Sequence, residues 1–326
     1  MTVNFPDGSS QQQLIEPTGL DGKSRARFIW ANQVPTDTSL FSLTLTLELD
    51  KANEPFLPEP LPVAVTIPVN VLPDTYRSPP EPDAQWAITQ TTGFRVHYIT
   101  GTKAERDLDY ILTEAQHAYT TITQFFGEYA ETVDIYILDR VIGQGGYASS
   151  DWVAISYPDR TYSPIDIGSL LRHELTHRLD AAIGCDNAPA LLREGLAVFL
   201  AGGHYREESL VSKASVVLAN GYMIPISSLL SDFYVNQHEV AYLEAAAFVA
   251  YIEESFGREG IETVCKSASK TQGTDQVKMN AAIRAVANTD FDRFVSQYRA
   301  WLNAQSLTGD DFELFEYELQ LMDLMR

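Results

Sequence analysis

Hydrophobic and polar residues alternate in the first 73 residues of the chain. Within residues 40–50, leucines at positions 43, 45, 47 and 49 are separated by Thr44, Thr46 and Glu48. A period of two is typical of a strand with one buried face. Residues 26–34 and 61–71 contain further strand-like runs, separated by proline- and glycine-containing turns. The pattern predicts a small β-sandwich over residues 1–73, in which no motif indicates chemistry.

A proline-rich stretch follows and covers residues 74–92. Pro79, Pro80 and Pro82 make it stiff and extended, which suits a linker between two domains. We expect the chain to divide here.

Beyond this stretch the pattern mixes strands and helices. Three strand patterns and one helical pattern come first, at residues 94–100, 133–139, 152–157 and 104–126. From residue 165 the chain is mostly helical. The order predicts an α+β domain over residues 93–306. Residues 307–326 form an acidic amphipathic segment that we expect to pack its apolar face on a domain.

Two histidines stand four positions apart in the segment HELTH, within a helical pattern. On a helix, His173 and His177 lie one turn apart on the same face, so both imidazoles can bind one ion. Glu174 lies at the flank of that face, where it can reach a metal-bound water without binding the metal. Asp180 falls in the same arc, while leucines on the other side face a core. The alternative, a hydrogen-bonded core histidine, suits a single histidine better than a pair at this spacing.

A third ligand is needed, because catalytic zinc takes three protein ligands and keeps one position for water. Glu194 lies in a second helical pattern, which Asn187 and Pro189 begin and Gly202 ends. Two antiparallel helices would place Glu194 beside the histidines, and Gly195 next to it allows close helix approach. The alternative is a surface carboxylate, but Glu194 stands inside an apolar run.

HELTH followed by LLREGLAVFL resembles the gluzincin metallopeptidases, the group of thermolysin and the aminopeptidase N family. The short, peptidase MA-like bacterial members are most similar, over about residues 93–306. The resemblance implies a thermolysin-like zincin domain with a mixed sheet, active-site helices and a C-terminal helical subdomain. It also implies one catalytic Zn²⁺ held by His173, His177 and Glu194, with Glu174 as the general base.

Two features depart from thermolysin. The spacing from His177 to Glu194 is shorter, which requires a tight connecting loop. Val198 stands where thermolysin carries an aspartate that orients a histidine. Asp180, one turn beyond His177, is the candidate replacement for this outer partner, and the alternative is a solvated charge near the helix end.

The segment VAYLEAAAFVAYIEESFG resembles a part of the aminopeptidase N family in which a tyrosine precedes a long helix. The resemblance implies that Tyr242 donates its hydroxyl to the developing oxyanion. The alternative is a tyrosine that packs at a helix start. His238 is a second candidate for the same task, whereas His97, His117 and His204 are predicted to be structural or exposed.

Residues 143–158 resemble the gluzincin edge strand that pairs with the substrate backbone. Gly145 and Gly146 would let another backbone approach closely. Ala148 stands where aminopeptidases carry a glutamate that binds the substrate's free amine, which favours an endopeptidase. The alternative for this strand is simple sheet structure.

Composition narrows the classes of partner. The 326 residues include 23 basic and 44 acidic ones, a net charge of −21 that repels nucleic acids and anionic membranes. No apolar run is long enough to span a bilayer, and the first residues do not form a signal peptide. Cys185 and Cys265 could pair or stay as buried thiols.

These patterns together predict a zinc-dependent hydrolase of peptide bonds, with a peptide or protein as substrate. Two alternatives remain open: a non-catalytic binding module on a zincin scaffold, and a zinc hydrolase of a non-peptide substrate. Location is open as well, and relatives that are often exported favour a secreted or cell-surface protein. The oligomeric state is left undecided.

Overall fold

The computed structural model describes residues 84–127, 129, 131–138, 145–157, 166–305 and 315, together with the backbone of four strands within residues 2–70. Backbone contacts divide the chain into two compact units, Met1–Pro82 and Asp83–Arg326. The division falls within the proline-rich stretch.

The first unit contains a four-stranded antiparallel sheet in the order β2-β1-β3-β4. Its strands are β1 (Thr2–Asn4), β2 (Ser10–Gln12), β3 (Leu40–Leu47) and β4 (Val63–Asn70). Strand β3 lies where the alternation of leucines predicts it. The expected strand at residues 26–34 is outside the described residues, so the β-sandwich stays a prediction.

The second unit opens with a five-stranded mixed sheet in the order β5-β6-β7-β9-β8. Its strands are β5 (Trp86–Gln90), β6 (Phe94–Ile99), β7 (Val133–Leu138), β8 (Gly146–Ala148) and β9 (Trp152–Ser156). Strands β6, β7 and β9 are parallel, while β5 and β8 pair antiparallel at the two edges.

Strand β5 corrects the expected linker, which ends before residue 86 and not at residue 92. Trp86, Ile88 and Thr89 are residues that favour strands, and a short turn lets β5 fold back onto β6. This hairpin belongs to the second unit. The second unit therefore begins earlier than the predicted boundary at residue 93.

Helices α1 (Lys103–Arg106) and α2 (Leu108–Phe126) connect β6 to β7. The single helix expected over residues 104–126 is interrupted at Asp107, whose backbone leaves helical geometry. Ile111, Ala115 and Ile122 are fully buried on one face of α2. This face and the alternate residues of the parallel strands form the core of this part of the unit.

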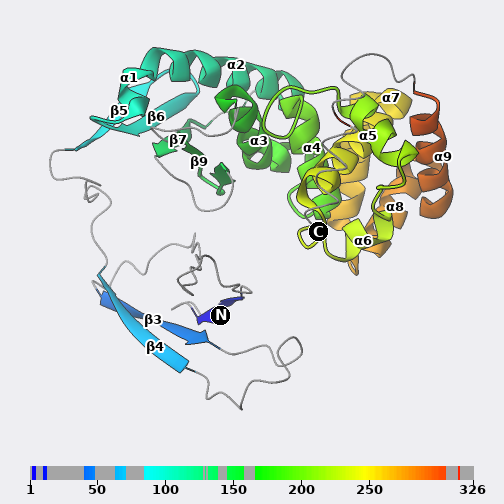
Figure 1. The fold of residues 1–326 in the computed structure, drawn as a ribbon, viewed down its shortest axis with the longest axis horizontal. Coiled ribbons are helices and arrows are strands. Elements are labelled where there is room, and N and C mark those ends of the chain that lie inside the picture. Colours follow the sequence, from blue (N-terminus) through cyan, green and yellow to red (C-terminus); the bar gives the residue numbers. More distant parts are fainter. Residues whose placement is uncertain are drawn as a thin grey trace. The chain divides into compact units, whose positions relative to one another are not determined.

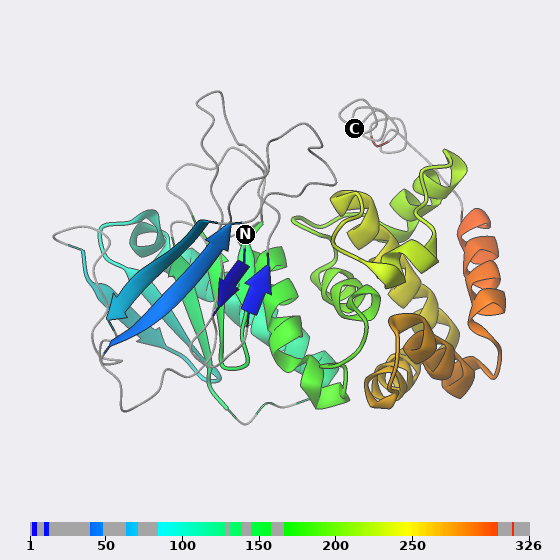
Figure 2. The ribbon, with the colours of Figure 1, turned by 90° about the horizontal axis from the view of Figure 1, so that it is seen from below.

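Residues 166–305 are mostly helical, as the sequence predicts, so the described part of the unit is α+β. Its helices are α3 (Ile167–Leu179), the 3-10 helix η1 (Asp180–Ile183), α4 (Ala190–Ala201), α5 (Leu210–Ala219), α6 (Ile226–Ser231), α7 (His238–Lys270), α8 (Asp275–Ala287) and α9 (Phe291–Asn303). Helices α3 and α4 lie between the sheet and the group α5–α9 (Figures 1 and 2). In residues 307–326 the structure describes Phe315 alone, which is buried beneath the ammonium group of Lys213. No helix in the described part of the chain could cross a membrane.

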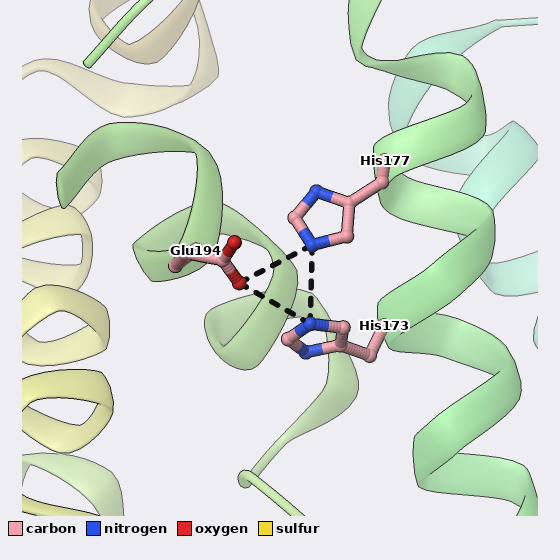
Figure 3. A group of neighbouring side chains, drawn as sticks. All are labelled: His173, His177 and Glu194. Atoms are coloured by element: carbon pink, nitrogen blue, oxygen red, sulfur yellow. Dashed lines mark hydrogen bonds and ion pairs between the residues drawn. The ribbon is translucent and has the colours of Figure 1, made fainter. Parts of the chain in front are cut away.

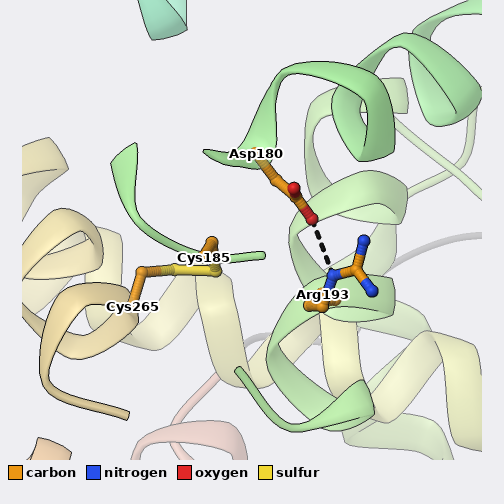
Figure 4. The surroundings of a disulfide bond; sticks show 4 residues. All are labelled: Asp180, Cys185, Arg193 and Cys265. Atoms are coloured by element: carbon orange, nitrogen blue, oxygen red, sulfur yellow. Dashed lines mark hydrogen bonds and ion pairs between the residues drawn. A yellow bond between two sulfur atoms is a disulfide. The ribbon is translucent and has the colours of Figure 1, made fainter. Parts of the chain in front are cut away.

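A disulfide joins Cys185 to Cys265, two residues 80 positions apart in the chain. Cys185 lies in the loop between η1 and α4, and Cys265 lies on α7 (Figure 4). The bond therefore ties the loop between the two central helices to the longest helix of the unit.

We expect the double variant Cys185→Ser, Cys265→Ser to lose about 2–4 kcal/mol of stability, because a long closed loop restricts the unfolded chain. Urea unfolding followed by the helical circular dichroism signal measures the loss. A reductant should lower the wild-type midpoint by a similar amount and leave the double variant unchanged. Equal midpoints for oxidised wild type and variant would contradict a stabilising bond.

Glu244 is a carboxyl group buried in the helical core, with no exposed surface. The backbone N–H of Ile224 donates to its Oε1 at 2.6 Å, and Oε2 has no hydrogen-bond partner among the described residues. Burial raises the pKa of Glu244 to about 8, against the hydrogen bond from Ile224. The folded protein therefore favours the protonated form of this group.

This group makes stability depend on pH. Between the ordinary value of 4.5 and about 8, the folded state holds more protons than the unfolded state, so the free energy of unfolding falls as pH rises. Glu244→Gln keeps the acceptor for Ile224 and removes this titration. We expect the free energy of unfolding of Glu244→Gln, minus that of wild type, to rise by on the order of a few kcal/mol from pH 5 to pH 9. Urea unfolding at both pH values tests this, and a constant difference between the two proteins would refute it.

Candidate metal centre

Helix α3 carries the two motif histidines on the side opposite its packing face. Asp166 caps the helix by accepting a hydrogen bond from the backbone N–H of Ser169 at 2.8 Å. Leu171 and Leu175 are fully buried in the core. His173 and His177 then project from the other side of the helix toward α4 (Figure 3).

Helix α4 brings Glu194 to the same place. The helix ends at Gly202, which takes the left-handed conformation at φ +77°, as the sequence predicts, while Pro189 stands at the N-cap where Asn187 is expected. Gly195 allows close helix approach, although the neighbour is α7: a Cβ at this position would collide with the backbone oxygen of Ala245. The absence of a side chain at residue 195 thus sets the distance between α4 and α7.

The three predicted ligands form a compact triangle (Figure 3). The Oε2 atom of Glu194 lies 3.4 Å from Nε2 of His173 and 3.3 Å from Nε2 of His177, and the two Nε2 atoms are 3.1 Å apart. Around a tetrahedral zinc ion with bonds of about 2.0–2.1 Å, neighbouring ligand atoms are about 3.3–3.4 Å apart. The two imidazoles and the carboxylate therefore fit one zinc ion.

Glu194 is largely buried, and its surroundings keep it charged. Burial raises its pKa, but the imidazoles of His177 and His173 outweigh burial and hold the pKa well below the usual range. The hydroxyl of Tyr234 donates to the other oxygen, Oε1, at 2.7 Å. Sequence reasoning missed Tyr234, since it lies 40 residues away in a loop that no motif marks.

Asp180 contacts a different partner from the expected one. Its carboxylate accepts a hydrogen bond from Nε of Arg193 at 2.7 Å (Figure 4). No described residue bonds to the buried Nδ1 atom of either His173 or His177, so Asp180 does not orient an imidazole here. The guanidinium is the stronger attractor for a buried carboxylate. The pair instead joins the end of α3 to α4, one residue before Glu194.

Glu174 lies beside the triangle with its carboxyl group almost completely buried. Burial raises its pKa to about 7, against the attraction of His173. A Cβ on Gly146 would collide with this carboxyl group, so β8 approaches Glu174 closely because residue 146 has no side chain. The predicted base and the predicted substrate strand are thus in contact.

A cavity of about 100 Å³ opens next to the triangle. Its walls are formed by Gly146, Leu170, His173, Glu174, His204, Tyr205, His238 and Tyr242. The ring of Tyr242 lies 6.3 Å from that of His173, and burial raises the pKa of its hydroxyl well above the ordinary value. Tyr242 is therefore a hydrogen-bond donor at the cavity.

Two further histidines belong to the cavity wall. His204, which the sequence analysis assigns to structural or exposed positions, is buried and stacks on Tyr242 with 4.2 Å between ring centroids. The side chain of His238 lies 4.5 Å from the same ring. Burial and stacking agree with a structural role for His204, and the fold in addition places it in the cavity wall, which nothing near it in sequence indicates.

Strand β8 forms one edge of the sheet and pairs antiparallel with β9 alone among the described strands. Gly145 precedes it in a positive-φ conformation of +130°, with the side chain of Leu170 close by. Ala148 ends the strand opposite Val153. No described strand pairs with the other side of β8, so an extended backbone could pair there as far as the described residues show.

Comparisons with known proteins add a distant likeness. No family model and no curated protein matches the chain. Among solved structures, an aminopeptidase N family protein from Idiomarina loihiensis matches with a TM-score of 0.38 and 12% identity over 71% of this chain and 49% of its own. An M1 zinc metallopeptidase variant from Deinococcus radiodurans, bound to a Tyr-Ser-Ala substrate, matches with a TM-score of 0.35 and 13% identity. This match covers 83% of the present chain and 63% of the Deinococcus chain. The chain thus spans about half to two thirds of these neighbours, and a likeness this weak carries no argument about function.

Tyr234→Phe should weaken zinc binding by about tenfold, because outer partners of metal ligands typically contribute 10–100-fold to affinity. The residue is 65% exposed, so the loss of its hydroxyl should leave the fold intact. Competition with a chromophoric chelator measures the affinity, and Glu194→Ala, which removes the ligand itself, gives the reference for complete loss. An unchanged affinity in Tyr234→Phe would show that the hydroxyl does not support the ligand.

Proposed function

We propose that this protein is a zinc-dependent hydrolase of peptide bonds. The observation that carries the proposal is the triangle of His173, His177 and Glu194, whose ligand atoms are spaced for one zinc ion. Glu174 and Tyr242 line the cavity beside it. A zinc ion bound there supplies Lewis acidity toward a water molecule and a carbonyl oxygen.

Glu174 is the general base in this proposal. It adjoins His173 in the chain and lines the cavity without belonging to the triangle, so it can accept a proton from the attacking water and pass it to the leaving amine. Burial favours its neutral form, and a nearby cation favours its ionised form. The base therefore exchanges protons easily near neutral pH.

Tyr242 serves as the donor to the oxyanion. Its hydroxyl keeps its proton under ordinary conditions, and its ring is held between His204 and Phe233, whose centroids lie 4.2 and 5.1 Å away. A donor fixed before the reaction stabilises developing charge without the cost of reorientation. The fixed ring and the protonated hydroxyl are thus compatible with the role proposed for Tyr242.

Strand β8 is the proposed docking site for the substrate backbone. An extended peptide would add to the side of β8 that no described strand pairs with, and would pass Glu174, which touches Gly146. Ala148 offers no carboxylate for a free amine. We therefore favour an endopeptidase over an aminopeptidase.

The disulfide supports an oxidising location. Such bonds persist outside the cell or in the periplasm and are rare in reducing compartments. We propose that the protein works outside the cytosol.

Glu174→Gln tests the function. We expect chelator-sensitive cleavage of a peptide library by wild type, and a loss of about 10²–10⁴-fold in the variant, since glutamine cannot accept the proton. The zinc content should stay the same. Glu207→Gln is the matched control, because the side chain of Glu207 is 79% exposed and the charge change is identical.

Two outcomes would redirect the assignment. Cleavage that survives in Glu174→Gln would remove the base from the mechanism. Stoichiometric zinc with no cleavage of any peptide would favour a zinc hydrolase of another substrate or a binding module on this scaffold.

A further inference from the structure

A second cluster of metal-binding side chains lies beside the cavity, and two of its members, His204 and His238, line it. His204 comes from the loop after α4, and His238 and Glu239 open α7. Each offers one ligand atom, and these atoms all lie within 4.8 Å of one another. We propose that His204, His238 and Glu239 form a second site for a divalent transition-metal ion, separate from the triangle of His173, His177 and Glu194.

The spacing of two donors already suits such an ion. Nδ1 of His204 lies 3.3 Å from Oε2 of Glu239, the separation of neighbouring ligands around zinc with bonds of about 2.0–2.1 Å. His238 does not yet point a nitrogen at the same place. Its ring centroid is 4.8 Å from that of His204, and its Nε2 is hydrogen-bonded to the hydroxyl of Tyr205 at 3.1 Å. Its ligand nitrogen nevertheless lies within 4.8 Å of the ligand atoms of the other two residues.

One of the three side chains, His204, is firmly built into the protein, while Glu239 reaches the surface with 42% of its side chain exposed. His204 is 7% exposed and stacks between Tyr205 and Tyr242, with centroids 4.0 and 4.2 Å away. A ring held on both faces is fixed before any ion arrives. Two imidazoles and one carboxylate suit zinc, cobalt or nickel better than calcium or magnesium.

Neighbouring charges set the strength of this site. The first turn of α7 carries partial positive charge from its N–H groups, which disfavours a cation. Lys213 also acts on Glu239, although its ammonium pairs with Glu208 at 2.6 Å. We therefore expect weaker binding here than at the first site, where Glu194 lies between two imidazoles.

The two sites contribute side chains to one cavity. His173 and Glu174 line it on the side of α3, and His204 and His238 line it from the loop after α4 and from α7. The ligand sets share no residue. Each site can therefore be removed alone.

Zinc counting on the whole chain tests the proposal. The protein is stripped with a chelator, dialysed to equilibrium against buffered zinc at a series of free concentrations, and its bound zinc is measured by atomic emission. Wild type should bind one zinc ion per chain at low free zinc concentration and a second zinc ion at higher free zinc concentration. Glu239→Gln should weaken the second by at least about tenfold, since even outer partners of ligands contribute 10–100-fold. His177→Ala should lose the first and keep the second.

A matched control separates the site from loose binding to an acidic protein of net charge −21. Glu207→Gln removes the same charge from an exposed position and should keep both equivalents. The proposal would be overturned if wild type bound only one zinc ion per chain, or if Glu239→Gln and Glu207→Gln gave the same zinc-binding curve. The cluster would then be a hydrogen-bond network only. Because the readout is bound metal, the result does not depend on hydrolytic activity.

Discussion

The convergence of two imidazoles on the buried carboxylate of Glu194 is the interaction on which the rest of the centre depends. A buried carboxylate without partners is costly, so His173 and His177 determine whether Glu194 can be ionised there at all. The hydroxyl of Tyr234 satisfies its second oxygen. Helices α3 and α4 must therefore keep their spacing for the charge to remain favourable.

Several contacts outside the triangle maintain that spacing. The pair of Asp180 and Arg193 joins the end of α3 to α4 at the residue before Glu194. Gly195 lets α4 approach α7, and the disulfide ties the loop between α3 and α4 to α7 as well. Since α7 also carries Tyr242, the helix that carries Glu194 and the helix that carries the proposed oxyanion donor are positioned together.

Local signals account for what the sequence could predict. His173 and His177 are readable because a helix fixes the geometry of residues four apart, and the apolar run with Gly202 at its end locates the helix of Glu194. Tyr234 and His204 were not readable, because each reaches the centre through loops whose path depends on the whole fold. Asp180 lies one turn beyond His177, as the sequence indicates. Its carboxylate, however, accepts a hydrogen bond from Arg193 on α4 and not from a histidine, and the sequence gives no sign of this contact between helices. The end of the linker could not be predicted for a related reason. The prolines indicate a break in the chain, but Trp86–Gln90 is a strand only because it pairs with the following strand, β6.

Gly146 connects the proposed base to the proposed substrate strand. Because the carboxyl group of Glu174 fills the space that a side chain at residue 146 would need, the base lies against the backbone of the edge strand itself. A peptide paired with β8 would place its own backbone one strand spacing away, about 4.8 Å. Strand pairing fixes the distance and direction of the peptide backbone. The same contact that buries Glu174, and so raises its pKa toward 7, would thus bring a particular peptide bond within its reach.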